Sequence, residues 1–234
     1  MGVNIIPILL SLKVAVASVL IVTCLSIPVA GHMVKRKFPG KDIIESLITL
    51  PLVLPPSVVG FILLYIFGKN GPLGRLLESM FNVRIVFTIW GAIIAAVVVS
   101  FPLMYQSVKA SIESVDPNLE NAARTLGAGE FKVFFTITLP LAWNGVLAGF
   151  VLAFARSLGE FGATLMIAGN IPGRTQTMPL AIYFYSEAGM SHEAIVLVLI
   201  MTIFSFLVIY GLNHWGKGSK RKAKRGMSDD KNEF

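Results

Sequence analysis

The stretch ENAARTLGAGEFKVFFTITLP, residues 120–140, is a polar and glycine-punctuated interruption in a chain that is otherwise strongly apolar. Just before it, Asp116 and Pro117 predict a helix N-terminus, because aspartate caps free backbone N–H groups and proline suits the first helical position. Gly127 fits the left-handed position that ends such a helix, and a second helix is predicted from about Glu130. One face of the first helix is apolar and is formed, at helical spacing, by Leu119, Ala122, Ala123 and Leu126.

The apolar face of this short helix contains small side chains, which bury little area and therefore stabilise a fold only weakly. Small side chains do allow close approach to a groove, so the helix is typical of one that docks into a partner. The alternative is an interfacial helix that rests on lipid. Helices of that kind favour Trp, Phe and Lys, and none of these occurs between Pro117 and Gly127.

The composition indicates a membrane protein. Of the 234 residues, 55% are hydrophobic and 14% are charged, whereas soluble domains carry about 25% charged residues. The net charge is +7, and six of the 20 basic residues lie between Lys217 and Arg225. Basic clusters beside apolar spans typically mark the cytoplasmic side, so this charge does not indicate nucleic-acid binding. We expect one transmembrane domain, residues 1–216, and a basic, disordered cytoplasmic tail, residues 217–234.

Five windows are long and apolar enough to cross a membrane, which takes roughly 20 residues per helix. Their orientation follows from the basic residues, because cytoplasmic loops carry more Lys and Arg. Four basic residues lie between His32 and Lys41 and none precedes the first span, which predicts an outer N-terminus and a cytoplasmic C-terminus. The expected fold is all-α, with residues 116–140 on the cytoplasmic side. The windows are approximately Ile5–Val34, Ile43–Gly68, Ile85–Val108, Pro140–Ala168 and Ala194–Trp215.

The second window is interrupted by the sequence LPLVLPP, residues 50–56. Proline removes a backbone donor and clashes with the preceding turn, so this helix must kink or break. Broken backbone at membrane depth is tolerated only inside protein or beside a water-filled cavity. Either the bend lines a pathway through the membrane, or it is a kink that improves packing. The candidate pathway residues here are Pro51, Pro55, Pro56 and Ser57.

The fourth window carries two ionisable residues, Arg156 and Glu160, four positions apart on one helix face. Ionisable groups at membrane depth are functional candidates by default. Counted from Pro140 at about 1.5 Å per residue, the pair falls near the outer interface. It is either a structural ion pair or part of an outer mouth, where Arg156 would attract an anion and Glu160 would orient it. In the same window, Gly145 and Gly149 predict close helix packing within the subunit rather than a dimer contact.

Residues 120–140 resemble the EAA loop of ABC-importer permeases, whose pattern is Glu-Ala-Ala, three residues, Gly, nine residues, Ile, one residue and Leu-Pro. In one departure, Asn121 stands where the pattern has Glu, and the acid is one residue earlier, at Glu120. Because 3.6 residues make one helical turn, this shift rotates the acid by about 100° around the helix. The matching positions are Ala122, Ala123, Gly127, Ile137, Leu139 and Pro140.

Other stretches make the chain similar to molybdate ABC-transporter permeases, and around residues 159–170 it also resembles sulfate permeases. This resemblance implies a type I ABC importer permease fold with about five spans and a coupling region at residues 116–140. It further implies a subunit that moves molybdate inward, with sulfate, thiosulfate or tungstate as alternatives. The stretches are FPGK (38–41), LPLVLPP (50–56), ARTLGAG (123–129), LAFARSLGEFGA (152–163) and GNIPGRTQT (169–177).

The resemblance also implies partners. The subunit would form a homodimer in a bacterial or archaeal cytoplasmic membrane, with two ATP-binding subunits inside and a molybdate-binding protein outside. ATP and Mg²⁺ would be held by the ATPase, because this chain has no P-loop motif, and no cofactor or metal site is expected in the subunit itself. The ATPase would contact Leu119, Glu120, Asn121, Ala122, Ala123, Leu126 and Gly127. The binding protein would contact Arg174, Thr175, Gln176 and Thr177, unless these form an ordinary solvated loop.

Two other classes of protein compete with a transporter. An intramembrane enzyme would need converging catalytic groups, but His32, His192 and His214 are not at metal-ligand spacing and no His-Glu-x-x-His motif occurs. A structural membrane anchor would need neither the broken second span nor the docking helix. We therefore expect a membrane transport subunit without enzymatic activity of its own.

Overall fold

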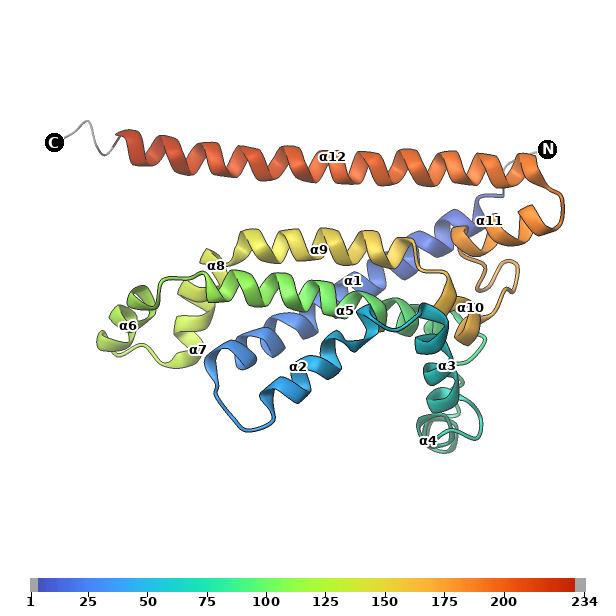
Figure 1. Cartoon of the computed structure of the whole chain (residues 1–234), viewed down its shortest axis with the longest axis horizontal. Coiled ribbons are helices and arrows are strands. Elements are labelled where there is room, and N and C mark those ends of the chain that lie inside the picture. The colour runs from blue at the N-terminus through green and yellow to red at the C-terminus, as the bar shows by residue number, and fades with distance from the viewer. Residues whose placement is uncertain (1–3, 230–234) are drawn as a thin grey trace.

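The computed structural model describes the backbone of residues 4–229 and the side chains of residues 4–211, and no β-strand occurs among them (Figure 1). The helices of the first half are α1 (Ile6–Lys35), α2 (Lys41–Thr49), the short 3-10 helix η1 (Leu50–Leu52), α3 (Pro56–Phe67), α4 (Pro72–Phe81) and α5 (Ile89–Glu113). Those of the second half are α6 (Pro117–Thr125), α7 (Glu130–Val133), the π-helix η2 (Phe134–Thr138), α8 (Leu139–Leu141), α9 (Trp143–Leu158), α10 (Gly162–Ala168), α11 (Met178–Glu187) and α12 (Ser191–Asp229).

Three helices are long and apolar enough to cross a membrane, namely α1, α5 and the Ser191–Gly211 part of α12. Two further segments pass the same test as bent pairs, Lys41–Leu52 with Pro56–Phe67 and Glu130–Leu141 with Trp143–Leu158. With each bent pair counted as one crossing, the described chain has the five spans that the sequence predicts. The prediction of an all-α, multi-span fold is confirmed.

The second span breaks where its prolines predict a break. The chain direction bends by 111° between its two halves. Pro55, at the bend, has an extended ψ of 137°. Pro56 then occupies the first position of α3. An N–H at this position has no acceptor within the helix, so proline loses no hydrogen bond there. Beyond the bend α3 packs tightly on α10, because a Cβ added at Gly60 would come within 2.7 Å of the Cα of Ala163. The bend therefore turns the second half of the span onto another short helix.

The fourth span differs from the predicted window, Pro140–Ala168. Its helix α9 ends at Leu158, and residues 162–168 form the separate helix α10. The crossing begins earlier, at Glu130, and is bent by 70° between Leu141 and Trp143. Helix α10 is separate because Oε1 of Glu160 accepts the backbone N–H of Ala163 at 2.7 Å and so begins a new helix. The prediction of one continuous span to Ala168 is therefore wrong.

Helices α5 and α9 pack closely in the centre of the bundle. A Cβ at Gly145 would lie 2.2 Å from the Cβ of Ser111, and Gly149 is likewise crowded by α5. The hydroxyls of Ser107 and Ser111 donate to the carbonyl oxygens of Gly145 and Ala142, each at 2.9 Å. The two glycines thus allow contact within the subunit, as predicted, and α5 satisfies carbonyl groups beside the bend of the fourth span.

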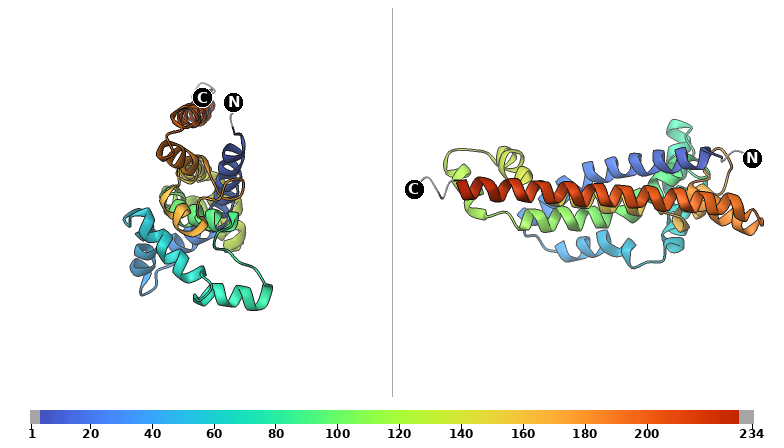
Figure 2. Two further views of the ribbon diagram at one scale, coloured as in Figure 1. Left: turned by 90° about the vertical axis from the view of Figure 1, so that its right-hand side faces the viewer. Right: turned by 90° about the horizontal axis from the view of Figure 1, so that it is seen from above.

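The two ends of the bundle carry different short elements. Helices α6 and α7 lie at one end, and α3, α4, α10 and α11 lie at the other (Figure 1). Helix α12 runs along the outside of the bundle, on the side opposite α2 and α4 (Figure 2). Only 11% of the apolar window of α12 is buried. This span therefore leaves a broad apolar surface for lipid or for another chain.

The backbone of α12 remains helical as far as Asp229, whereas a disordered tail was predicted from residue 217. Residues 217–225 are rich in Lys and Arg, which have high helix propensity, and this favours continuation of the helix. Residues 230–234 of that tail lie outside the described residues. The domain boundary at residue 216 stays a prediction.

Candidate coupling site

Helix α6 begins and ends as its sequence predicts. The carboxylate of Asp116 accepts the backbone N–H of Asn118 at 2.9 Å, and Pro117 occupies the first helical position. After the helix, Gly127 has φ +84°. This is the left-handed backbone conformation, which is strained for any residue with a Cβ. The N–H of Ala128 then donates to the carbonyl of Ala123 at 3.0 Å and closes the turn. The local signals therefore determine both ends of the helix.

The apolar face of α6 is not covered by the rest of the chain. No residue of the helix is buried, and Leu119, Asn121, Ala122 and Gly127 are all exposed. Leu126 is 89% exposed, although it is a large apolar side chain. The helix lies at the end of the bundle, away from α3 and α10 (Figure 1). This exposed face has the geometry of a docking surface for a partner outside the membrane.

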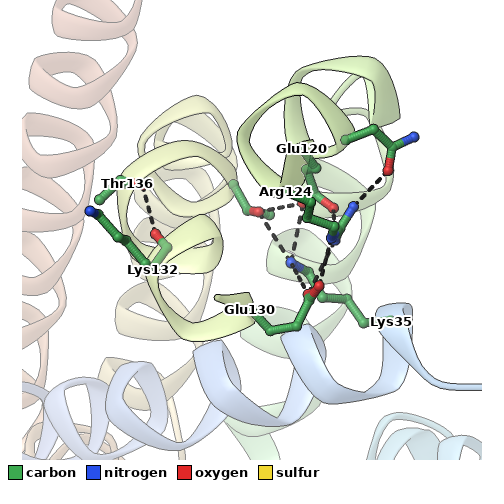
Figure 3. Close-up of polar contacts among 8 residues, drawn as sticks. Lys35, Glu120, Arg124, Glu130, Lys132 and Thr136 are labelled. Atoms are coloured by element: carbon green, nitrogen blue, oxygen red, sulfur yellow. Dashed lines mark hydrogen bonds and ion pairs between the residues drawn. The ribbon is translucent and has the colours of Figure 1, made fainter. Parts of the chain in front are cut away.

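Glu120 lies on the other side of α6 and points into the subunit. Its carboxylate accepts a short hydrogen bond from the hydroxyl of Thr138 and lies 3.2 Å from the ammonium of Lys35. Arg124 donates to Glu120 at 3.0 Å and to Glu130 at 2.5 Å. Figure 3 shows Glu120, Arg124 and Glu130 gathered around Lys35, the last residue of α1. We call Lys35, Glu120, Arg124, Glu130 and Thr138 the Glu120 cluster.

The environment of Glu120 keeps its carboxyl group ionised. Burial alone would raise its pKa, but hydrogen bonds from Thr138, Arg124 and Lys35 outweigh this effect and hold the pKa of Glu120 below its usual value. The hydrogen bonds to Glu130 and Glu120 raise the pKa of Arg124 above its already high value. Glu120, Arg124 and Glu130 are therefore charged at neutral pH, and each has a partner of opposite sign.

A pocket of about 460 Å³ opens beside the Glu120 cluster. Its walls come from the ends of α1 and α5, from α6 and from the start of α7, and three carboxylates and two basic groups line it. The two basic groups, Lys35 and Arg124, are already bonded to carboxylates. The pocket is therefore a gap behind the docking helix rather than a ready site for a free anion.

The candidate pathway residues of the second span lie on the surface of the single chain. Pro55, Pro56 and Ser57 are exposed, Pro51 is half-buried, and Val53 between them is 82% exposed. A Cβ added at Gly162 would lie 3.0 Å from the Cβ of Pro56, so the broken segment touches the start of α10. The break of the second span thus lies beside the first residue of α10.

Arg156 and Glu160 form an ion pair, with Nη1 of the arginine 2.6 Å from Oε2 of the glutamate. The side chain of Glu160 is 1% exposed and that of Arg156 is 29% exposed. The other oxygen of Glu160 caps α10 at the N–H of Ala163. Both carboxylate oxygens therefore have partners within the subunit, which favours the structural interpretation of this pair. The hydrogen bond from the Ala163 N–H to Glu160 was not predicted from the sequence.

The structure buries three of the four residues that were predicted to contact a binding protein, and the contact itself stays a prediction. Arg174 is exposed, but Thr175, Gln176 and Thr177 are buried in the subunit. The hydroxyl of Thr175 accepts the N–H of Ile171 and donates to the carbonyl of Gly169, each at 3.0 Å. The Thr175 hydroxyl thus holds the loop in shape, and of the four residues only Arg174 is available to a partner in this conformation.

Four residues of the Glu120 cluster, Lys35, Arg124, Glu130 and Thr138, were not identified as site residues from the sequence. From the sequence, Lys35 was predicted only to be one of the basic residues that set the orientation of the membrane spans. Thr138 stands within the Ile-Thr-Leu-Pro end of the EAA pattern, and this position was a signal that could have identified it. The fold brings Lys35, Glu120 and Thr138 together although they are separated by many residues along the chain.

A bundle of helices that can span a membrane, with the exposed short helix α6 at one end, defines a multi-span membrane subunit. Residues 9–216 match the family described as the binding-protein-dependent transport system inner membrane component, and the chain belongs to this family. It is therefore a transport permease subunit of an inner membrane.

Individual relatives agree with this assignment. The molybdenum transport system permease protein ModB of Haemophilus influenzae is 45% identical, over 94% of this chain and 97% of the relative. The sulfate transport system permease protein CysW of Synechococcus elongatus is 37% identical, over 81% of this chain and 67% of the relative. The MetNI methionine ABC transporter, solved in inward-facing conformations, has the same fold, with a TM-score of 0.71 at 13% identity over 92% of this chain and 95% of that one. The predicted type I ABC importer permease fold is confirmed.

Proposed function

We propose that this chain is the membrane permease subunit of an ABC importer that moves molybdate into the cytoplasm. The observation that carries the proposal is the 45% identity to a molybdenum transport permease over almost the full length of both chains. The exposed face of α6 supports it, because an importer permease must receive an ATPase from the cytoplasm. The chain itself has no P-loop motif, so ATP and Mg²⁺ would be bound by that ATPase and no cofactor would be bound by this subunit.

The docking helix α6 defines the ATPase contact in this proposal. Leu119, Asn121, Ala122, Leu126 and Gly127 are the exposed members of the predicted set. Small and apolar side chains on this face would let the helix enter a groove of the ATPase. Glu120 points into the subunit instead, so it would act on coupling from within rather than by touching the ATPase.

A homodimer is the assembly that the second span supports. Broken backbone at membrane depth cannot face lipid, yet Val53 at the break is 82% exposed in the single chain. A second copy would cover this face, and the anion pathway would run between the two copies. Two ATPase subunits would then bind the two α6 helices, and an extracytoplasmic binding protein would deliver the anion at the opposite end of the bundle. The pathway residues would be Pro51, Pro55, Pro56 and Ser57.

The second candidate substrate is sulfate or thiosulfate, because a sulfate permease is 37% identical to the chain. Tungstate is a third candidate, since it has nearly the same shape and charge as molybdate. Reconstitution decides among these. Vesicles that contain this chain, its ATPase and its binding protein are expected to take up radiolabelled molybdate only with ATP, and a large excess of sulfate should not compete. Uptake of sulfate in preference to molybdate would contradict the proposal, and failure of two differently tagged copies to co-purify would contradict the homodimer.

The proposed orientation places α6 in the cytoplasm and the N-terminus outside. Reporters fused after Val34 or Gly129 are therefore expected to be active on the cytoplasmic side, and one fused after Gly71 on the outer side. The physical reason is the four basic residues of the first loop, which disfavour translocation. Alkaline phosphatase and fluorescent-protein fusions at each point provide the measurement. An external signal at Val34 would show that the number of spans or their orientation is wrong.

A further inference from the structure

Three elements that are remote in sequence meet at the end of α1. Lys35 closes α1, Glu120 belongs to the docking helix α6, and Thr138 belongs to the π-helix η2 of the fourth span. The ammonium of Lys35 lies 3.2 Å from the carboxylate of Glu120 and 3.4 Å from the hydroxyl of Thr138. The hydroxyl of Thr138 donates to the same carboxylate and is fully buried. The three polar groups therefore form a closed triangle between two spans and the docking helix.

An apolar contact joins the same face of α1 to η2 one turn before Lys35. The ring of Phe134, also in η2, lies so close to Gly31 that a Cβ there would meet it at 2.7 Å. The ammonium of Lys35 lies 5.5 Å from the centre of the same ring, within the range of a cation–π contact. A π-helical turn contains an extra residue and occurs often at functional sites. The last turn of α1 is thus fixed to η2 by packing as well as by hydrogen bonds.

Helix α6, in contrast, has little else to hold it. None of its residues is buried, and its partners in the rest of the subunit are mainly those of the Glu120 cluster. The position of the acid matters here. Asn121 occupies the exposed position that holds Glu in the EAA pattern, while Glu120, rotated by about 100°, points inward. The acid of this chain is therefore placed to bond within the subunit.

We propose that Lys35, Glu120 and Thr138 form a mechanical link that carries movement of the docking helix into α1 as well as into the fourth span. The inference rests on the proposed function only in that α6 receives an ATPase. When α6 moves with the ATPase, the carboxylate of Glu120 moves the ammonium of Lys35 and the hydroxyl of Thr138 with it. The three side chains are positioning residues, because they contact neither the ATPase nor the anion. Without the link, α6 moves while α1 stays behind.

The test removes the hydroxyl group of Thr138 from this set of three contacts and keeps the shape of its side chain nearly unchanged. Thr138→Val replaces the buried hydroxyl by a methyl group. Thr136→Val is the matched control, because Thr136 lies in the same π-helix but is exposed and bonds only to the carbonyl of Lys132. In the complex with the ATPase, amide hydrogen exchange of residues 31–35 is measured with and without ATP. We expect ATP to change this exchange in the wild type and in Thr136→Val, and to change it much less in Thr138→Val.

Transport and ATPase activity are measured on the same samples. Thr138→Val is expected to bind the ATPase normally and to hydrolyse ATP, but to take up molybdate about tenfold less per ATP, the scale of losing a hydrogen bond to a charged group. A merely structural role would reduce abundance and leave the ATP-dependent exchange unchanged. If Thr138→Val does not fold, Lys35→Met, which keeps the stem over Phe134, replaces it, with the exposed Lys37→Met as control.

The outcomes distinguish the link from the proposed function. An ATP-dependent change at residues 31–35 that persists in Thr138→Val and in Lys35→Met, or that is absent from the wild type, would overturn the link. A wild-type complex that shows this change and loses it in the variants, but imports an anion other than molybdate, would support the link and contradict only the proposed substrate.

Discussion

Replacing Gly127 with valine is expected to reduce molybdate uptake by at least about tenfold while the subunit still reaches the membrane, because the left-handed backbone costs a residue with a Cβ about 1–2 kcal/mol and a β-branched residue more. The value of φ at Gly127 is +84°, and an added Cβ would meet no atom within 4 Å. The effect is therefore one of backbone conformation and not of crowding. A tenfold change corresponds to about 1.4 kcal/mol, so the strain is sufficient to move α6 out of its docking position.

Gly129→Val is the control for this prediction. Gly129 lies two residues further along the same loop with φ −69° and ψ 159°, a conformation that any residue adopts, and an added Cβ there also meets no atom. Uptake and co-purification of the ATPase are measured for both variants. We expect both to fall in Gly127→Val and to be retained in Gly129→Val. Wild-type co-purification together with normal uptake in Gly127→Val would falsify the role of this turn in coupling.

The coupling region was predictable because its determinants are local. Asp116, Pro117 and Gly127 each act on the backbone within a few residues of themselves, so sequence spacing alone predicts where α6 begins and ends. The break of the second span was predictable for the same reason, since proline at Pro55 and Pro56 disrupts a helix whatever surrounds it. The structure agrees with the sequence at all of these positions.

The fourth span was predicted less well because hydropathy does not show how a side chain is bonded. Residues 140–168 are apolar enough to be one span, but the chain divides at Glu160, whose carboxylate caps α10. A capping bond from this position depends on the fold of the following turn, and its sequence signal is weak. A helix from about Glu130 was predicted, but the crossing was expected to begin only near Pro140, because the first residues of that helix are polar.

The side chains that point inward could not be placed from the sequence. Glu120 was grouped with the ATPase contact because it lies within the docking helix, yet the fold directs it to Lys35 and Thr138. Thr175, Gln176 and Thr177 have the composition of a solvated loop, but they are buried in the subunit, where the Thr175 hydroxyl is hydrogen-bonded. The contact between Glu120 and Lys35 joins residues far apart in the chain, and burial of a polar loop depends on the helices around it, so no local pattern encodes either.

The Arg156–Glu160 pair gives the largest expected effect on stability. In Arg156→Gln the buried carboxylate of Glu160 loses its cation, and breaking a buried ion pair from one side costs about 3–5 kcal/mol. Glu160→Gln is expected to cost less, because the amide oxygen can still accept the N–H of Ala163 and the remaining arginine is partly exposed. The double variant should recover part of the loss, since no unpaired charge remains. Lys69→Gln is the control, because it removes a positive charge from an exposed position between α3 and α4, at the same end of the bundle.

Membrane abundance, thermal unfolding in detergent and molybdate uptake of all four variants separate a structural pair from an outer mouth. A structural pair predicts that abundance and unfolding temperature fall in the order just given and recover in the double variant, with uptake following the amount of folded protein. An outer mouth predicts instead that Arg156→Gln is as abundant as the wild type but takes up less molybdate, because a positive charge that attracts the anion is lost. Glu160→Gln would then not weaken uptake by repulsion, since it removes a negative charge. The buried carboxylate and its bond to α10 favour the first result, and normal abundance and uptake in every variant would exclude both roles.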